Sequence, residues 1–293
     1  MVFIVLFLVG CLGGSGASTP VKEISTQTIS FDALPVLTVG ASSVISATSS
    51  SNLPVSFEVN TTLTCAAQGC PTPPQPACSI TGNVVTALSI GTCSIVATQA
   101  GSANSSAVQA TQELVIASVK IQTAKGVIGI ELFDTAAPLT VANFLSYVNS
   151  GAYNNSIIHR SMPGFIIQGG GFTNSLGAIS ATAPVVNEFS ADRSNVRGTI
   201  AMAKFAGDPN SATNQWFINL TDNSASLDGQ NGGFTVFGRV VGNGMQVAEA
   251  IAALSVVNAG ILNGAFTNLP LLNPLAINQQ LSLSDLVAVS ISK

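Results

Sequence analysis

Charged side chains are scarce in this sequence, and their scarcity narrows the classes of protein to which it can belong. Only 8% of the 293 residues are charged, against roughly 25% in an average soluble domain. Nine lysines and arginines stand against thirteen acidic residues, which gives a net charge of −4. Such a chain offers no basic surface for nucleic acid, so we expect no nucleic-acid partner.

Long apolar runs are lacking as well. The first ten residues, MVFIVLFLVG, form a run about half as long as a membrane-spanning helix, which is typical of a secretory signal. The run ends at Leu8–Cys11, which resembles the lipobox of bacterial lipoproteins. We therefore expect a signal segment at 1–10, a lipid on Cys11 and a flexible tether over 11–28. The protein would then be exported and held at a periplasmic or cell-surface bacterial membrane; an ordinary signal cleaved after Ala17 is the alternative.

The sequence also lacks paired C-x-x-C motifs. Its remaining cysteines are Cys65, Cys70, Cys78 and Cys93. An even number behind an export signal indicates disulfides in an oxidising compartment. Zinc is the alternative, but the spacing disfavours it, and we expect no metal site. A Cys78–Cys93 bond would join neighbouring strands and a Cys65–Cys70 bond would close a small loop, although four cysteines permit three pairings.

Short runs rich in Val, Ile, Thr and Ser fill residues 29–116. Turn residues separate them at near-regular spacing, which predicts a β-sandwich. The stretch CSITGNVVTALSIGTCSI predicts two strands around a Gly-Asn turn, followed by a third strand. This region resembles bacterial immunoglobulin-like modules. The resemblance implies a spacer, with adhesion as the alternative.

Residues 117–293 combine strand patterns with two helix patterns. A hairpin is expected over 119–133, joined through Lys125-Gly126. Helices are expected over 136–151, with Pro138 in the first turn, and over 242–254. With about eight strands around them, these elements predict a closed β-barrel capped by two helices.

Four motifs in order carry the functional prediction. They are IIHRSMPGFIIQGGGF at 157–172, GTIAMAK, SATNQWFINLTDNSASLDG and FTVFGRVVGNGMQVAEAI. This order resembles the cyclophilin family of peptidyl-prolyl cis-trans isomerases over about 118–289. The resemblance implies an eight-stranded barrel closed by two helices, a monomer, and no metal or cofactor.

The chemistry of an Xaa-Pro bond explains the mixture of one arginine with apolar residues. Rotation costs about 18–20 kcal/mol because resonance keeps the amide planar. No covalent bond breaks, so a catalyst must hold the proline ring, exclude water and stabilise the twisted amide. The resemblance implies that Arg160 does this and that Gln168 orients it. It also implies a substrate-binding set: Phe165, Ile166, Ala203, Lys204, Gln215, Phe217, Leu227 and Phe234.

Two nearby features invite other readings. His159, the only histidine, suggests acid–base catalysis, but the sequence has no G-x-S-x-G motif, and in the family this residue is structural. The run Gly169–Gly171 suggests a phosphate loop, but it lacks the lysine and the helix of such loops. Ser226 stands where many animal cyclophilins have tryptophan, which predicts weak cyclosporin binding.

We therefore predict a prolyl isomerase that assists the folding of exported proteins and binds unfolded or extended proline-containing polypeptides. The alternatives are a proline-peptide-binding chaperone without turnover and a surface adhesion module.

Overall fold

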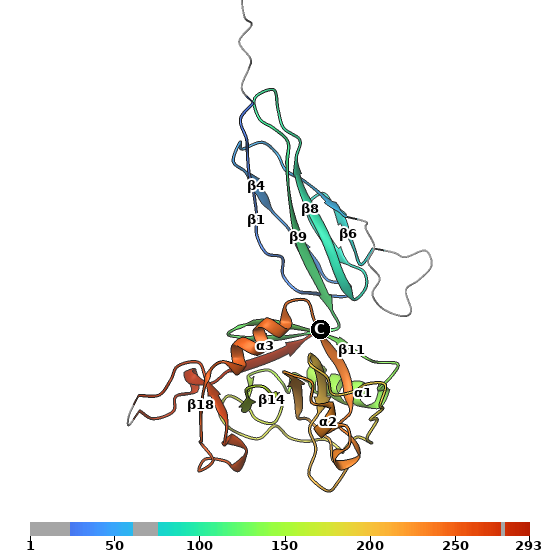
Figure 1. Cartoon of the computed structure of the whole chain (residues 1–293), viewed down its shortest axis with the longest axis vertical. Helices are drawn as coiled ribbons and strands as arrows, with labels where there is room; N and C mark the ends of the chain where they lie inside the picture. Colours follow the sequence, from blue (N-terminus) through green and yellow to red (C-terminus); the bar gives the residue numbers. More distant parts are fainter. Residues whose placement is uncertain (1–23, 61–75, 277–278) are drawn as a thin grey trace, which may run out of the picture.

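The described chain forms two lobes joined end to end (Figure 1). The computed structural model describes residues 24–60, 76–276 and 279–293. The predicted signal segment, Cys11, Cys65 and Cys70 lie outside these residues. The lobes meet near Ser118, and most of their regular structure is β. Within the described residues, no helix is both long and apolar enough to cross a membrane.

A nine-stranded sheet makes up most of the C-terminal lobe. Its order is β12-β20-β10-β11-β17-β15-β16-β14-β13. The strands are β10 (Val119–Thr123), β11 (Gly126–Leu132), β12 (Ser156–Ile157), β13 (Arg160–Met162), β14 (Ile166–Gly169), β15 (Thr199–Met202), β16 (Trp216–Asn219), β17 (Val236–Val241) and β20 (Ala288–Ser292). The hairpin β10–β11 forms as predicted, although its two-residue turn is Ala124-Lys125, one residue earlier than expected.

The two end strands of the sheet, β12 and β13, follow each other in the chain. The sheet therefore curls, since its two ends must come close together. Between β12 and β13, Ile158 N–H donates to the Val287 carbonyl (3.0 Å) and His159 N–H donates to the Gln168 carbonyl (3.1 Å). The short segment between β12 and β13 is therefore hydrogen-bonded to residues at both ends of the sheet. The sheet has nine strands where eight were predicted.

Helices form where the sequence predicts them, and one short helix was not predicted. Helix α1 (Pro138–Asn149) begins at its proline, and Gly151 follows its end with a φ of +72°. Helix α3 (Gly244–Ala252) buries Ala248, Ile251 and Ala252. The unpredicted α2 (Ser224–Leu227) has one turn. The described residues also contain three 3-10 turns, η1 (Gln230–Gly232), η2 (Gly264–Phe266) and η3 (Leu283–Asp285).

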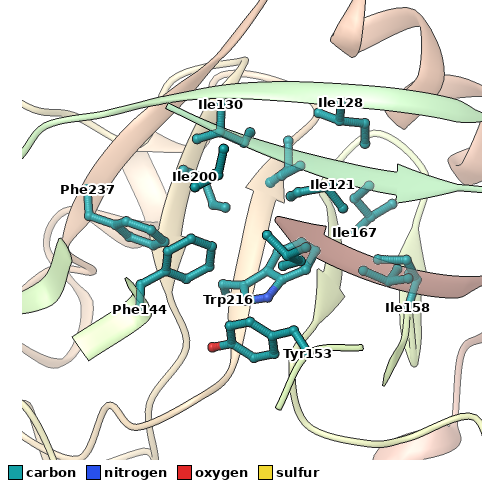
Figure 2. Packing of buried hydrophobic residues seen from close by; sticks show 14 of the residues in the cluster. Ile121, Ile128, Ile130, Phe144, Tyr153, Ile158, Ile167, Ile200, Trp216 and Phe237 are labelled. Carbon is teal, nitrogen blue, oxygen red and sulfur yellow. The ribbon is translucent and has the colours of Figure 1, made fainter. Parts of the chain in front are cut away.

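The inner face of the sheet and the helices share one apolar core (Figure 2). Alternate residues of β11, Ile128 and Ile130, point into it, as a two-residue period requires. From α1, Phe144 meets Phe237 with ring centroids 5.1 Å apart. Trp216 of β16 is fully buried in the same core.

A second, smaller core lies outside this sheet and involves residues 255–286. Strands β18 (Ser255–Val257) and β19 (Leu269–Leu271) pair with each other. Phe172 and Phe266 are buried between this hairpin and the main sheet. The Asn268 carbonyl accepts a hydrogen bond from Ser161 N–H of β13 (2.8 Å). These residues therefore form a folded layer behind β13.

The N-terminal lobe contains two sheets and a two-stranded pair around one core. One sheet has the order β2-β9-β8-β5, the other β3-β7-β6, and β1 pairs with β4. The strands are β1 (Ile29–Phe31), β2 (Leu37–Thr38), β3 (Ser42–Val44), β4 (Ala47–Ser49), β5 (Ser56–Val59), β6 (Cys78–Thr81), β7 (Val84–Ala87), β8 (Gly91–Gln99) and β9 (Val108–Ala117). The predicted Gly82-Asn83 turn joins β6 to β7.

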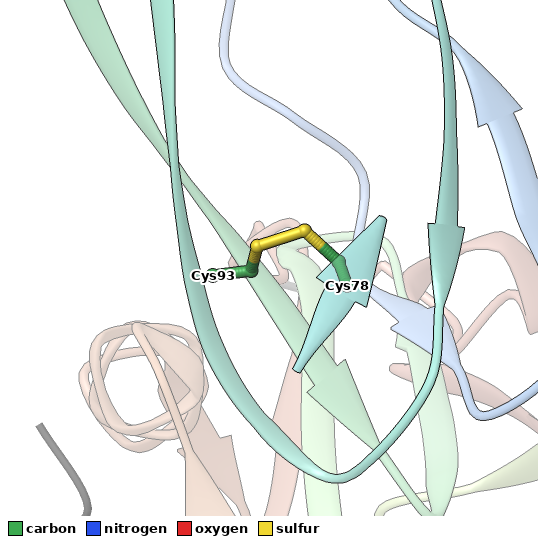
Figure 3. The surroundings of a disulfide bond; sticks show 2 residues. All are labelled: Cys78 and Cys93. Atoms are coloured by element: carbon green, nitrogen blue, oxygen red, sulfur yellow. A yellow bond between two sulfur atoms is a disulfide. The ribbon is translucent and has the colours of Figure 1, made fainter. Parts of the chain in front are cut away.

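A disulfide between Cys78 and Cys93 links these two sheets (Figure 3). Their Cα atoms are 6.0 Å apart, a separation usual for disulfides. Because Cys78 lies on β6 and Cys93 on β8, the bond crosses between sheets. The sequence pattern predicted a bond between neighbouring strands, and this part of the prediction was wrong.

The connection between the lobes is a single residue. Ser118 separates β9 from β10, its N–H donates to the Ile130 carbonyl (2.8 Å), and its hydroxyl accepts from Leu132 N–H (2.9 Å). Across the junction, Gly242 has a φ of +56°, and a Cβ there would lie 2.4 Å from a methyl of Val115. The lobes are therefore in direct contact at a position that admits only glycine.

Candidate active site

The register of the strands in the curled sheet determines where the side chains of the site lie. Arg160 pairs with Gln168, and Gln168 pairs with Phe217. Phe217 also pairs with Ala201, which pairs with Val236 after a β-bulge. Directly paired residues point to the same face of an antiparallel sheet. The sheet therefore carries a guanidinium, an amide and an apolar floor in one continuous row.

The turn between β13 and β14 sets the register of this row. Phe165 N–H donates to the Met162 carbonyl (2.9 Å), and Gly164 between them has a φ of +74°. The resulting tight turn places Arg160 directly opposite Gln168. The sequence Met-Pro-Gly-Phe thus supplies the local geometry that joins two of the predicted site residues.

Arg160 is half-buried and bound by neutral groups. It donates to Gln168 Oε1 (3.2 Å) and to the Met162 sulfur (2.7 Å). The two ion pairs found among the described residues, Arg197–Glu249 and Arg239–Glu131, do not involve it. Desolvation lowers the pKa of Arg160 from its ordinary value, a shift that still leaves an arginine charged. The site therefore contains a partly desolvated cation that has no carboxylate partner in the part of the chain that the structure describes.

A chain of amides continues from the arginine. Gln168 Nε2 donates to Gln215 Oε1 (2.8 Å), and Gln215 shares a side-chain hydrogen bond with His159. Gln215 can lie this close because Gly171 has no side chain; a Cβ there would be 2.9 Å from the Gln215 amide carbon. A Cβ on Gly169 or Gly170 would lie 2.8 Å from the Trp216 ring, so these two glycines make room for that side chain. Packing therefore accounts for all three glycines without a phosphate.

His159 itself belongs to the core. Its side chain is buried, and burial lowers its pKa to about 4, so the ring is neutral at ordinary pH. It meets Phe172 edge-on with centroids 5.0 Å apart. The ring therefore packs and supports Gln215, which agrees with a structural role.

The predicted apolar residues gather in one cluster beside the arginine. Its members come from β14, β15, β16, α2 and the approach to β17; they are Ile166, Ala201, Phe217, Leu227 and Val236, with Phe133, Phe165, Ala203 and Phe234 packed against them. Phe217 and Phe234 meet edge-on at 5.8 Å. All six apolar residues of the predicted substrate-binding set are here.

Three members of this cluster were missed from the sequence. Val236 lies two residues after Phe234, and Ala201 lies two residues before Ala203, so strand alternation could have found both. Phe133 follows β11, and the sequence carries no signal that brings it to this cluster.

Ala203, which belongs to this cluster, is followed in the chain by Lys204, the last residue of the predicted set. Ala203 N–H donates to the Gln215 carbonyl (2.9 Å), so this donor is already used within the protein. The Lys204 ammonium lies 5.0 Å from the centre of the Phe234 ring. Ser226, on α2, donates to the Asn223 carbonyl (3.0 Å) and is exposed.

Comparison with known proteins assigns the chain to a family. The family described as cyclophilin type peptidyl-prolyl cis-trans isomerase/CLD matches residues 118–267. Peptidyl-prolyl cis-trans isomerase A of Dickeya dadantii is 45% identical over 143 residues, which are 48% of this chain and 74% of the relative. Peptidyl-prolyl cis-trans isomerase B of Escherichia coli is 42% identical over 147 residues, which are 49% of this chain and 88% of the relative.

Among solved structures, a Cryptosporidium parvum cyclophilin type isomerase, crystallised in the presence of the dipeptide Ala-Pro, matches with a TM-score of 0.44 and 23% identity. The match covers 59% of this chain and 96% of that one.

The family match and the two relatives confirm the predicted family and enzyme class. The conclusion concerns the C-terminal lobe, where the match lies. This chain belongs to the cyclophilin family and is a peptidyl-prolyl cis-trans isomerase.

Proposed function

We propose that Arg160 accelerates isomerisation by donating a hydrogen bond to the prolyl nitrogen of the twisted amide. That nitrogen has no free lone pair while the amide is planar, and it regains one as the bond rotates. A donor fixed beside it favours the twisted state over the planar states, and such selectivity lowers the barrier. The absence of a carboxylate on Arg160 among the described residues supports this role, because the guanidinium is free to face a substrate.

The arginine needs the apolar cluster to reach a useful rate. An acceleration of about 10⁵ requires about 7 kcal/mol of selective stabilisation. One charge-assisted hydrogen bond contributes about 1.5–3 kcal/mol. We propose that the cluster around Phe217 holds the proline ring and excludes water, which strengthens the field of the guanidinium. Gln168 and Gln215 would keep the guanidinium oriented toward the ring.

The test is exchange NMR on an Ala-Pro peptide. We expect wild type to accelerate exchange and Arg160→Ala to lose about 10- to 100-fold of the rate while still binding the peptide. Arg197→Ala, which removes an exposed arginine, is the matched control and should exchange at the wild-type rate. Full activity of Arg160→Ala would refute the mechanism. Peptide binding by wild type without acceleration would favour the chaperone alternative.

We also propose that the enzyme works on exported polypeptides, as a lipid-anchored monomer. The disulfide of the N-terminal lobe supports an oxidising compartment, and the Leu8–Cys11 motif supports the anchor. Radiolabelled palmitate should be incorporated by wild type and lost in Cys11→Ser. Retained label in that variant would exclude this anchor.

The finer fold assignment belongs to the same proposal. We infer that the nine-stranded sheet acts as a closed barrel, supported by the bonds of Ile158 and His159 to its two ends. We infer an immunoglobulin-like sandwich for the N-terminal lobe, supported by two sheets that share one core and a disulfide between them. A spacer role for this lobe predicts that residues 24–117, expressed alone, bind no cell-wall or host ligand.

A further inference from the structure

The Lys204 ammonium is hydrogen-bonded to backbone carbonyls of the protein. Its Nζ donates to the carbonyls of Asn231 (2.8 Å), Gly233 (2.5 Å) and Pro209 (3.4 Å). An ammonium has three hydrogens, so these carbonyls use all of them. The same nitrogen lies 5.0 Å from the centre of the Phe234 ring, within the range of a cation–π contact.

These bonds join two loops that flank the apolar cluster. One loop, 204–211, follows β15; the other, 229–234, precedes β17. Asn231 adds a bond in the opposite direction, because its Nδ2 donates to the Phe205 carbonyl (2.8 Å). A cavity of about 430 Å³ lies between the loops, and Lys204 and Phe234 both line it.

The second loop depends on the hydrogen bonds of Lys204 to keep one conformation. Asn231, Gly232 and Gly233 have φ values of +52°, +73° and +75° in succession. Glycines lose much conformational freedom when a chain is held in one shape. Two of the three carbonyls that Lys204 binds belong to this stretch, and Phe234 follows it directly. The position of the Phe234 ring against Phe217 therefore depends on these bonds.

We propose that Lys204 is a positioning residue that fixes Phe234 and thereby sets the shape of the proline pocket. It acts through Phe234 and contacts no reacting atom. The inference rests on the proposed function, because it takes the cluster around Phe217 as the proline pocket. It assigns to Lys204 an effect on substrate affinity, whereas the proposed mechanism assigns to Arg160 an effect on turnover.

The charge of the ammonium gives the proposal a second, independent signature. Desolvation lowers the pKa of Lys204 from its ordinary 10.5, and Asp208 partly opposes this. Asp208, on the first loop, is the charged group that acts on Lys204. Asp228, at the start of the second loop, bonds Ser194 and Asn195. A neutral amine donates weaker hydrogen bonds than an ammonium, so alkaline solution should loosen the loops.

The experiment compares wild type, Lys204→Met and Lys204→Arg in an assay that resolves kcat from KM for a Xaa-Pro peptide. Lys204→Met should raise KM about tenfold and change kcat by less than about threefold. Lys204→Arg should restore KM to within about threefold of wild type. Lys125→Met, at an exposed turn, is the matched control and should leave both constants unchanged.

The second arm follows KM from about pH 7 toward about pH 10. KM should rise with pH in wild type and stay level in Lys204→Arg, whose guanidinium remains charged. Lys204→Met should have a high KM at every pH. An unchanged KM in Lys204→Met, or the same alkaline rise in Lys204→Arg, would overturn the proposal. Failure of the proposed mechanism is a different result, in which Arg160→Ala keeps the wild-type kcat.

Discussion

The ring of Phe266 meets the ring of Phe172 edge-on, with centroids 4.7 Å apart. Phe172 meets His159 in the same way at 5.0 Å, and His159 bonds Gln215 of the amide chain. Phe266 lies on η2, in the layer behind β13. A row of three rings therefore connects this layer to the residues beside Arg160.

Removing the outermost ring should weaken the fold. Phe266 is fully buried, and truncating a buried Phe to Ala usually costs about 3–5 kcal/mol. We expect Phe266→Ala to lower the free energy of unfolding by this amount in urea titrations. Phe205→Ala removes a ring that is 75% exposed and should change stability by less than about 0.5 kcal/mol. Equal losses in the two variants would contradict the packing described.

His159 should make stability fall on mild acidification. Its pKa is about 4 in the folded protein and 6.5 ordinarily, so between these values the unfolded chain binds the proton more tightly. Stability is therefore complete above pH 6.5 and falls as the pH drops toward 4, by about 3 kcal/mol in all. Urea titrations across this range should show the loss in wild type and a smaller loss in His159→Gln. The lowered pKa of Asp228 acts in a separate window, below its ordinary 3.8.

Glu188 should stabilise the start of α1. This helix has no side-chain cap of its own, and the Glu188 carboxylate accepts from Leu139 N–H (3.1 Å), Thr140 N–H (2.7 Å) and the Thr140 hydroxyl (2.7 Å). Glu188→Gln should cost about 1–2 kcal/mol, as loss of a cap does. Glu249→Gln breaks an exposed ion pair and should cost less than about 1 kcal/mol. Thermal unfolding of both variants gives the comparison, and a larger loss in Glu249→Gln would refute the assignment.

Loss of the disulfide should destabilise the N-terminal lobe and spare catalysis. The bond closes a loop of 15 residues, for which about 3 kcal/mol is expected. The double variant Cys78→Ala/Cys93→Ala should unfold that lobe earlier in a thermal scan and keep the wild-type kcat. A fall in kcat at temperatures where both lobes are folded would show that the lobes are coupled.

Much of this architecture could be read from local patterns. Pro138 and Gly151 mark the two ends of α1, and alternation in CSIVATQ matches the buried Cys93, Ile95 and Ala97 of β8. These predictions hold because helix ends and strand faces are decided by neighbouring residues. The family motifs were equally local, and the residues they indicate do gather at one face of the sheet.

What could not be predicted depends on contacts between distant segments. The row from Arg160 to Val236 is fixed by strand register, which no single segment specifies. The layer containing Phe266 could not be predicted, because its core is completed by Phe172 and Ile157, far away in the sequence. The Lys204 contacts were missed for the same reason, since their acceptors lie on another loop.

The one-residue junction at Ser118 has a consequence for how the molecule moves. Because the N–H and the hydroxyl of Ser118 are both bonded to β11 and Val115 lies against Gly242, we expect that the two lobes do not rotate independently. The two lobes should share a single rotational correlation time and reorient as one elongated rod (Figure 1). The site around Arg160 should then keep a fixed orientation relative to the long axis, so a client polypeptide would reach it from one fixed direction relative to the N-terminal lobe.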